Sequence, residues 1–250
     1  MQGSIAGSDR PNVVFILLDD VGFADLGCFG SEISTPHVDA LAARGLRYTN
    51  FHVTPMCSPT RAALLTGVNS HRAGAGSVAN SDPGFPGYAA ELAHDVATMA
   101  ETFRDAGYAT FALGKWHLTK DADMNDAGPK ASWPLQRGFD RYYGFLDAFT
   151  NLHQPHRLVE DNHTVEVDRY PDGYYLTDDL TERALDLIAQ AKASDPAKPF
   201  LCYLAHGAVH APLHARADDL ERQRGRYDGG WDEVRAQRFD RQQALGLLSD

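Results

Sequence analysis

The sequence has little of three features that would have assigned it to a class at once. It holds three cysteines among 250 residues, too widely spaced for a disulfide framework or a zinc-binding pattern. No apolar run approaches the length of a membrane-spanning helix. Basic residues are also in deficit, since 23 Lys and Arg face 34 Asp and Glu and leave a formal charge of −11. That charge argues against nucleic acid or an anionic membrane as the main partner, but it leaves room for a locally positive site that binds a small anion.

The first ten residues lack the apolar core of a secretory signal peptide. They are polar and contain Gly and Ser. A cytoplasmic location is therefore the default expectation. A periplasmic or secreted location is expected instead if the natural N-terminus has been trimmed.

Apolar runs alternate with helical patterns along the chain. Continuous apolar runs, typical of strands buried on both faces, occupy residues 12–18, 108–113 and 200–205. Helical spacing with capping signals occupies residues 35–45, residues 95–107 with Asp95 as the N-cap, and a stretch that begins at Thr177. This order predicts an α/β fold with a mostly parallel sheet flanked by helices.

The remaining segments carry weaker patterns. Residues 46–53 are expected to form a further strand, and residues 67–94, rich in Gly, Pro, Ser and Asn, a long surface loop. Residues 119–175 are expected to be an irregular insertion over the sheet. Residues 216–250 have helical spacing and many charges, but no pattern there indicates chemistry.

Two adjacent carboxylates, Asp19 and Asp20, directly follow the first apolar run. At the end of a buried strand they repel each other and lose hydration unless a positive group holds them. A hard cation that prefers oxygen ligands is one such group. A solvated turn is the alternative, because Asp is a favoured turn residue. The pair is therefore a candidate metal site.

Cys57 precedes a short helical pattern that contains Pro59 and Arg61 and stops at Gly67. Pro59 is expected at the first helical position and Gly67 just beyond the last turn. The Cys57 thiol would then lie at a helix N-terminus, where unpaired N–H groups and the helix dipole favour an anion, with Arg61 one turn further on the same face. A free cysteine is also commonly a small core residue. Both interpretations stay open on this segment alone.

Lys115 and His117 end the second apolar run, and His210 follows the third. Lys115 and His117 share a side if they continue the strand, since side chains alternate with period two. A lysine can hold an anion and a histidine can carry protons near neutral pH, although such residues are more often plain surface groups. Ligands of parallel sheets bind beyond the carboxyl ends of the strands. The convergence of these residues with the carboxylate pair and the cysteine predicts one site at that edge.

The segment Cys57-Ser58-Pro59-Thr60-Arg61 resembles the Cys-x-Pro-x-Arg maturation motif of type I sulfatases, members of the alkaline-phosphatase-like superfamily. The resemblance extends in the expected order over nearly the whole chain, through residues 11–20, 26–30, 35–39, 114–118, 137–140 and 210–212. Among sulfatases the chain most resembles the bacterial arylsulfatases.

The resemblance implies a role for each candidate catalytic residue. Cys57 would be converted to formylglycine by a formylglycine-generating enzyme, and the hydrated aldehyde would be the nucleophile. Arg61 would orient the hydrate and Lys115 would bind sulfate. His117 would assist the second hydroxyl, and His210 would sit beside the leaving oxygen. Splitting the reaction through a covalent step agrees with the needs of sulfate ester hydrolysis.

The resemblance also implies a metal. Asp19, Asp20 and the modified Cys57 would bind a divalent cation, Ca²⁺ rather than Mg²⁺. Three departures from the family stand out. Val68 replaces an Arg that many members carry, and the second metal-binding pair, an Asp-Asn after a later strand, has no counterpart before Asp250. A later lysine that contacts sulfate is missing as well, so the metal site is expected to be incomplete.

The implied function is an arylsulfatase-type sulfuric ester hydrolase that acts on a small-molecule sulfate ester. Residues 1–250 would form the N-terminal portion of the catalytic domain, without the C-terminal metal-ligand region and the small C-terminal domain. Hydrolysis of phosphonate or phosphate monoesters on the same scaffold is one alternative. A truncated, non-catalytic remnant is the other.

Overall fold

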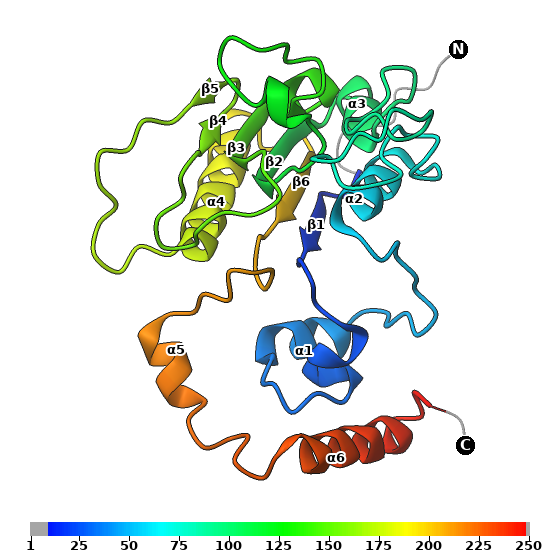
Figure 1. Ribbon diagram of the computed structural model, residues 1–250, viewed down its shortest axis with the longest axis vertical. Coiled ribbons are helices and arrows are strands. Elements are labelled where there is room, and N and C mark those ends of the chain that lie inside the picture. The colour runs from blue at the N-terminus through cyan, green and yellow to red at the C-terminus, as the bar shows by residue number, and fades with distance from the viewer. Residues whose placement is uncertain (1–9, 249–250) are drawn as a thin grey trace. The chain divides into compact units, whose positions relative to one another are not determined.

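The computed structural model describes residues 10–248, which form two compact units (Figure 1). Unit 1 contains the described residues up to Asp19 together with residues 54–214. Unit 2 contains residues 20–53 and the described residues from Ala215 onward. None of the helices in the described residues is both long enough and apolar enough to cross a membrane. The expectation of a cytoplasmic location rests mainly on residues 1–9, which lie outside the described part of the chain.

Unit 1 is built on a sheet that is parallel over its main part. Its described strands, in the order in which they pair, are β1 (Val13–Leu17), β6 (Phe200–Ala205), β2 (Ala109–Lys115), β3 (Arg141–Phe145), β4 (Val159–Glu160) and β5 (His163–Thr164). The first four are mutually parallel, and the short β4 and β5 run antiparallel. The predicted mostly parallel α/β sheet is thus confirmed.

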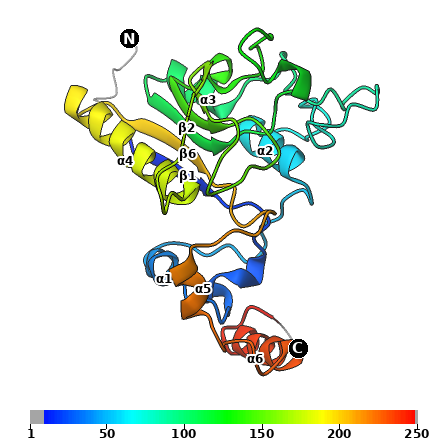
Figure 2. The same ribbon diagram turned by 60° about the vertical axis from the view of Figure 1, so that its left-hand side comes forward.

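Helices cover both faces of this sheet, as Figures 1 and 2 show. On one face, α2 (Cys57–Thr66) and α3 (Met99–Asp105) share an apolar core with alternate residues of β1, β2 and β6. On the other face, α4 (Leu176–Ser194) buries its apolar stripe against β2, β3 and β6. The stripe has helical spacing, and the predicted start at Thr177 lies within one residue of the observed start at Leu176.

The first strand corrects one expectation. Its residues alternate between the core and solvent, with Val14 50% and Ile16 62% exposed, so it is not buried on both faces. Within the described residues β1 pairs on one side, with β6, and α4 packs against the other strands of the sheet. A continuous apolar run shows that a strand could be buried on both faces. It does not show whether neighbouring elements cover both of those faces.

The segment of residues 119–175 corrects a second expectation. It is not merely an irregular insertion, because it contributes β3, β4 and β5 to the sheet as well as the short 3₁₀ helices Asp121–Asp123 and Pro134–Arg137. The strands are short and rich in Tyr and Gly, so they lack the continuous apolar signal of β2 and β6.

The loop of residues 67–94 has no helix or named strand, as expected, but it is less superficial than predicted. Several of its small residues are fully buried, among them Ala73, Ala75 and Leu92, and they join the core above α2. The helix predicted to begin at Asp95 begins later. Thr98 is its N-cap and forms a capping box with Glu101, whereas Asp95 pairs with Arg72.

Unit 2 is helical in its described residues. It contains α1 (Pro36–Ala42), α5 (Ala217–Arg222), α6 (Trp231–Ala244) and the 3₁₀ helices Phe23–Asp25 and Gly27–Phe29. Arg238 of α6 binds Asp25 and Glu32, which joins the end of the chain to the segment after β1. The helical spacing seen in residues 216–250 is confirmed.

The strand expected over residues 46–53 does not form. Its apolar side chains are exposed in the structure, Leu46 by 84%. Unit 2 has no strand in its described residues with which this segment could pair, and an apolar alternation without a pairing partner does not make a strand.

Candidate active site

The predicted site residues of unit 1 gather where the carboxyl ends of β1, β6 and β2 meet. Asp19 follows β1, and Lys115 is the last residue of β2. The loops after β1 and β6 are joined by two backbone hydrogen bonds, from Asp19 N to Ala208 O (2.9 Å) and from Val209 N to Asp19 O (2.7 Å). Parallel strands direct their ends to one edge, which is the reason that residues distant in sequence become neighbours here.

Asp19 lies between two buried cations. Its carboxylate oxygens are 2.6 Å from Nζ of Lys115 and 3.3 Å from a terminal nitrogen of Arg61, and all three side chains are at most 5% exposed. Arg61 also donates to the carbonyl oxygen of Lys115 (2.8 Å). The carboxylate therefore holds the two cationic side chains together, and their charges exceed its own by one. A small anion is the species that such a balance favours.

Cys57 is the first residue of α2, and its Sγ lies 3.1 Å from Nδ1 of His117. The helix thus begins two residues earlier than predicted, and Pro59 occupies the third helical position instead of the first. This costs no hydrogen bond, because the first four N–H groups of a helix have no intrahelical acceptor. Gly67 ends the helix with φ +70°, as expected. The cysteine therefore stands among unpaired backbone N–H groups, the environment predicted for an anion.

His117 is held toward Cys57 by its own backbone. It has φ +53°, a left-handed conformation that is uncommon for a residue with a side chain. Its N–H donates to Leu146 O (3.1 Å), and its carbonyl accepts from Oγ of Ser58 (2.7 Å). The same Oγ accepts from Ala79 N (3.1 Å), which ties the loop of residues 67–94 to the site. Because β2 ends at Lys115, His117 lies outside the strand and its direction is not set by strand alternation.

Burial controls the charge of the two titratable groups beside Cys57. Burial, followed by repulsion from Lys115, Arg61 and His210, lowers the pKa of His117 to about 3. Its imidazole is therefore neutral at physiological pH. Burial and the neighbouring Arg61 also lower the pKa of Lys115, and the attraction of Asp19 opposes this shift. His117 can accept a proton, while Arg61 supplies a permanent positive charge.

Several buried polar atoms of this region have no hydrogen-bond partner. They are Nε of Arg61, Nε2 of His117 and Nδ1 of His206, whereas the hydroxyl of Tyr203 interacts with the side chain of Arg61. Leaving such atoms unpaired is costly, so together they point to a polar occupant of the site. Tyr203 and His206 were missed by the sequence analysis. Tyr203 lies inside the apolar run of β6, and His206 directly follows that run without a motif of its own.

The described residues do not by themselves form a cage for Ca²⁺. That ion prefers about 6–8 oxygen ligands, and no group of three or more His, Cys, Asp or Glu side chains is placed to hold a metal in residues 10–248. Both oxygens of Asp19 are taken by Lys115 and Arg61. Asp20, with φ +61°, belongs to unit 2. The assignment of Asp19, Asp20 and Cys57 as metal ligands stays a prediction.

His210 lies on the loop after β6 and is half-buried. Its Nδ1 is 2.6 Å from Ala211 O, and its ring stacks on Phe149. It is near enough to His117 to contribute to the low pKa of that residue. The predicted position of His210 beside the other candidate catalytic groups is consistent with this electrostatic contact.

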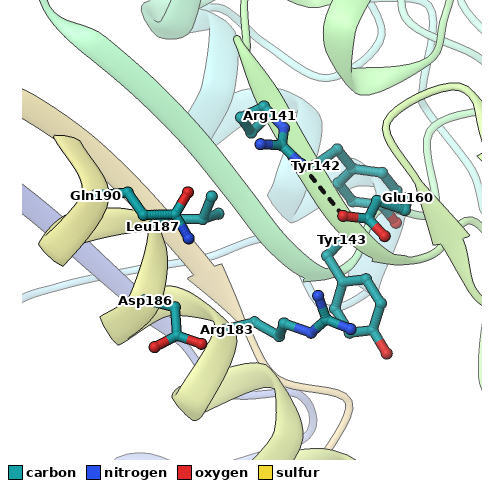
Figure 3. Close-up of a pocket in the computed structure, with 8 residues that line it drawn as sticks. All are labelled: Arg141, Tyr142, Tyr143, Glu160, Arg183, Asp186, Leu187 and Gln190. Atoms are coloured by element: carbon teal, nitrogen blue, oxygen red, sulfur yellow. Dashed lines mark hydrogen bonds and ion pairs between the residues drawn. The ribbon is translucent and has the colours of Figure 1, made fainter. Parts of the chain in front are cut away.

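A small pocket between α4 and the strands β3 and β4 is separate from these residues (Figure 3). Three of the charged side chains that line it, Arg141, Glu160 and Arg183, have partners. Arg141 binds Glu160, as the dashed line in Figure 3 marks, and also Asp161, while Arg183 lies 4.5 Å from the ring centroid of Tyr143. None of the predicted site residues lines it. We regard it as part of the packing between helix and sheet.

Acidification is expected to destabilise unit 1 through His206. Burial lowers the pKa of His206 in the folded chain below its usual 6.5, so only the unfolded chain gains a proton when the pH falls below that value. The stabilisation is therefore complete above about pH 6.5 and is lost below it, by up to about 1.4 kcal/mol per pH unit. Urea unfolding near pH 7.5 and 5.5 measures this loss, and His117 adds to it with the same sign.

The variant His206→Gln should reduce this pH dependence. Exposed His163 provides the matched control, since His163→Gln leaves the buried imidazoles unchanged. An equal slope in wild type and His206→Gln would contradict the assignment to His206.

Comparison with known proteins gives a consistent result. The family model described as Sulfatase matches residues 11–247. The chain is 36% identical over 255 residues to the arylsulfatase of Klebsiella aerogenes, which covers 98% of this chain and 53% of that protein. The crystal structure of Ps i-CgsB is similar with a TM-score of 0.74 and 26% identity, over 96% of this chain and 56% of that one.

A third comparison concerns the fold alone. A structure solved in complex with its substrate D-glucosamine-2-N,6-O-disulfate matches 91% of this chain and 42% of its own with a TM-score of 0.66 and 24% identity. The chain spans about half the length of the curated relatives that it matches, or less.

Proposed function

The chain belongs to the sulfatase family, and we propose that it carries the nucleophile and the anion-binding groups of an arylsulfatase-type sulfuric ester hydrolase. One observation supports this above the others. Cys57 at the N-terminus of α2 faces His117, and Lys115, Asp19 and Arg61 form a charged cluster at the same sheet edge. Catalysis of sulfate ester cleavage needs such fixed positive charge beside a nucleophile.

In this proposal Cys57 is the precursor of formylglycine. The hydrated aldehyde would supply two hydroxyl groups, one to attack sulfur and one to expel sulfate afterwards. The surroundings of Cys57 fit a hydroxyl-bearing residue. Nδ1 of His117 lies at hydrogen-bond distance from the Sγ position, and the neutral imidazole can accept a proton there. The unpaired N–H groups at the start of α2 favour negative charge on the same atoms.

Lys115 and Arg61 would bind the sulfate group. Both are buried, so little water competes with them for an anion. Nε of Arg61 has no hydrogen-bond partner and is available for a sulfate oxygen. Asp19 keeps the two side chains in position through its ion pairs. His210 is proposed beside the leaving oxygen, on the loop that joins Asp19 through Ala208 and Val209.

The family resemblance also implies Ca²⁺ at Asp19, and we keep this as a proposal about a completed site. Lys115 and Arg61 occupy the carboxylate, so a cation has to displace at least one of them to bind there. The remaining ligands have to come from groups other than the buried cluster of unit 1.

Peptide mass spectrometry after co-expression with a formylglycine-generating enzyme tests the proposal. We expect the peptide that contains Cys57 to carry the aldehyde, and we expect kcat/KM for an aryl sulfate to exceed that for an aryl phosphonate. A higher value for the phosphonate would assign the chain to phosphonate or phosphate ester hydrolysis. An unmodified Cys57 in the presence of the maturation enzyme would indicate a non-catalytic remnant.

A further inference from the structure

Two loops at the carboxyl edge of the sheet are fastened to each other. One follows β3 and covers residues 146–153, and the other follows β6 and covers residues 206–214. Leu152 N donates to Nδ1 of His214 (3.2 Å), and the rings of His153 and His214 lie 5.5 Å apart. A Cβ at Gly207 would lie 3.0 Å from Cζ of Phe145, so the second loop approaches the end of β3 closely. The two loops are therefore in direct contact with each other at this edge of the sheet.

These two loops also carry an aromatic pair. The rings of Phe149 and His210 are nearly parallel, at an angle of 10°, with 6.0 Å between their centroids. Phe149 is nevertheless 56% exposed. An exposed phenylalanine that is fixed against a second ring presents a flat apolar surface at little further cost in conformational entropy.

The loop that carries Phe149 is bonded to the residue that faces the nucleophile. The first loop begins at Leu146, whose carbonyl oxygen accepts the N–H of His117 (3.1 Å), and His117 is the residue that faces Cys57. Phe149 is three residues further along. His210 is near enough to His117 to influence its charge. The backbone of this loop thus links the aromatic pair to His117, and the charge of His210 also acts on that residue.

We propose that Phe149 and His210 form a ring platform that binds the flat face of a ring in the alcohol half of the sulfate ester. The proposal rests on the proposed function and names the residues that would contact the alcohol half of the substrate. Aryl groups and the apolar face of a sugar share this chemistry. A platform that contacts the ring equally in the bound substrate and in the transition state lowers KM and leaves kcat nearly unchanged.

Turnover of three sulfate esters by the mature protein tests the platform. The substrates are 4-nitrophenyl sulfate, a hexose 6-sulfate and ethyl sulfate, which has no ring. Phe149→Ala should lower kcat/KM for a ring-bearing ester by roughly 3- to 10-fold, mainly through KM, and leave ethyl sulfate unchanged. Phe149→Trp should retain the preference. A loss with the aryl ester alone or with the sugar ester alone identifies the ring that is bound.

Phe85→Ala is the matched control, because Phe85 is an exposed phenylalanine on another loop of unit 1. Equal losses with all three esters, or no loss with either ring-bearing ester, would overturn the platform. Thermal unfolding of the variants excludes a change in stability as the cause.

A binding experiment separates the platform from the proposed function. Phenol and a methyl hexoside are titrated into the chain while the imidazole proton resonances of His210 are followed by NMR. A saturable shift of these resonances that disappears in Phe149→Ala supports the platform even if no ester is turned over. Absence of any shift with both compounds contradicts it, whatever the activity.

Discussion

Replacing Cys57 by alanine is expected to lower kcat/KM for an aryl sulfate by at least about 10³-fold in the mature protein. The change removes the atom that faces Nδ1 of His117 at 3.1 Å and with it the precursor of the nucleophile. Lys115 and Arg61 still bind the anion, but binding without a nucleophile gives only residual catalysis. Alanine is a strong helix former, so α2 should still begin at this position.

Steady-state kinetics on purified protein measure this loss. Cys28→Ala is the control, because Cys28 is a half-buried free cysteine of unit 2 that plays no part in the proposed chemistry. It should keep nearly full activity. If Cys57→Ala retained a substantial fraction of wild-type turnover, the nucleophile would have to be another group. An intact Tm in the variant would show that the loss is chemical and not structural.

Asp19→Ala is expected to lower the free energy of unfolding by about 3–5 kcal/mol, because it leaves Lys115 and Arg61 buried without a counter-charge. Their side chains are at most 2% exposed and cannot recover their hydration without opening the structure. For a protein of this size the loss corresponds to a fall in Tm of roughly 10 °C. Thermal and urea unfolding measure both quantities.

An exposed ion pair of the same unit supplies the comparison. Arg72 and Asp95 are 2.8 Å apart, with side chains 56% and 68% exposed. Asp95→Ala should cost less than about 1 kcal/mol, since water replaces the lost partner. The double variant Asp19→Ala/Lys115→Met should recover part of the stability by removing one of the stranded charges. Equal losses for Asp19→Ala and Asp95→Ala would show that the buried cluster is hydrated.

The strongly periodic parts of the fold could be predicted from the sequence. The runs that became β2 and β6 lie in the middle of the sheet, where burial on both faces leaves a continuous apolar signal. The stripe of α4 and the glycine that ends α2 were equally clear. Strands that form only because a neighbouring strand pairs with them could not be predicted from the sequence. The tyrosine-rich β3 was missed, and residues 46–53 were given a strand that has no partner within the described residues.

Some residues of the site could also be predicted, because they lie at the ends of clearly patterned elements. Lys115 and His117 could be found because they end a strand, and Cys57 because a helix begins there. The pairing of Asp19 with two cations could not be foreseen, since it depends on how β1 and β2 are placed on either side of β6. Tyr203 escaped detection because a tyrosine within an apolar run has the pattern of a core residue.

Phe149 was missed for a different reason. A phenylalanine in an irregular segment carries no periodic signal, and its importance depends on a ring supplied by another loop.

The outer side of β1 has a consequence for the behaviour of the chain in solution. Val14 and Ile16 lie exposed on a strand that pairs on one side with β6 in the described structure, and such a strand is a template for association with another chain. The formal charge of −11 opposes that association by mutual repulsion. Salt screens the repulsion but leaves the apolar attraction in place. The chain should therefore be more soluble at low ionic strength than at high ionic strength.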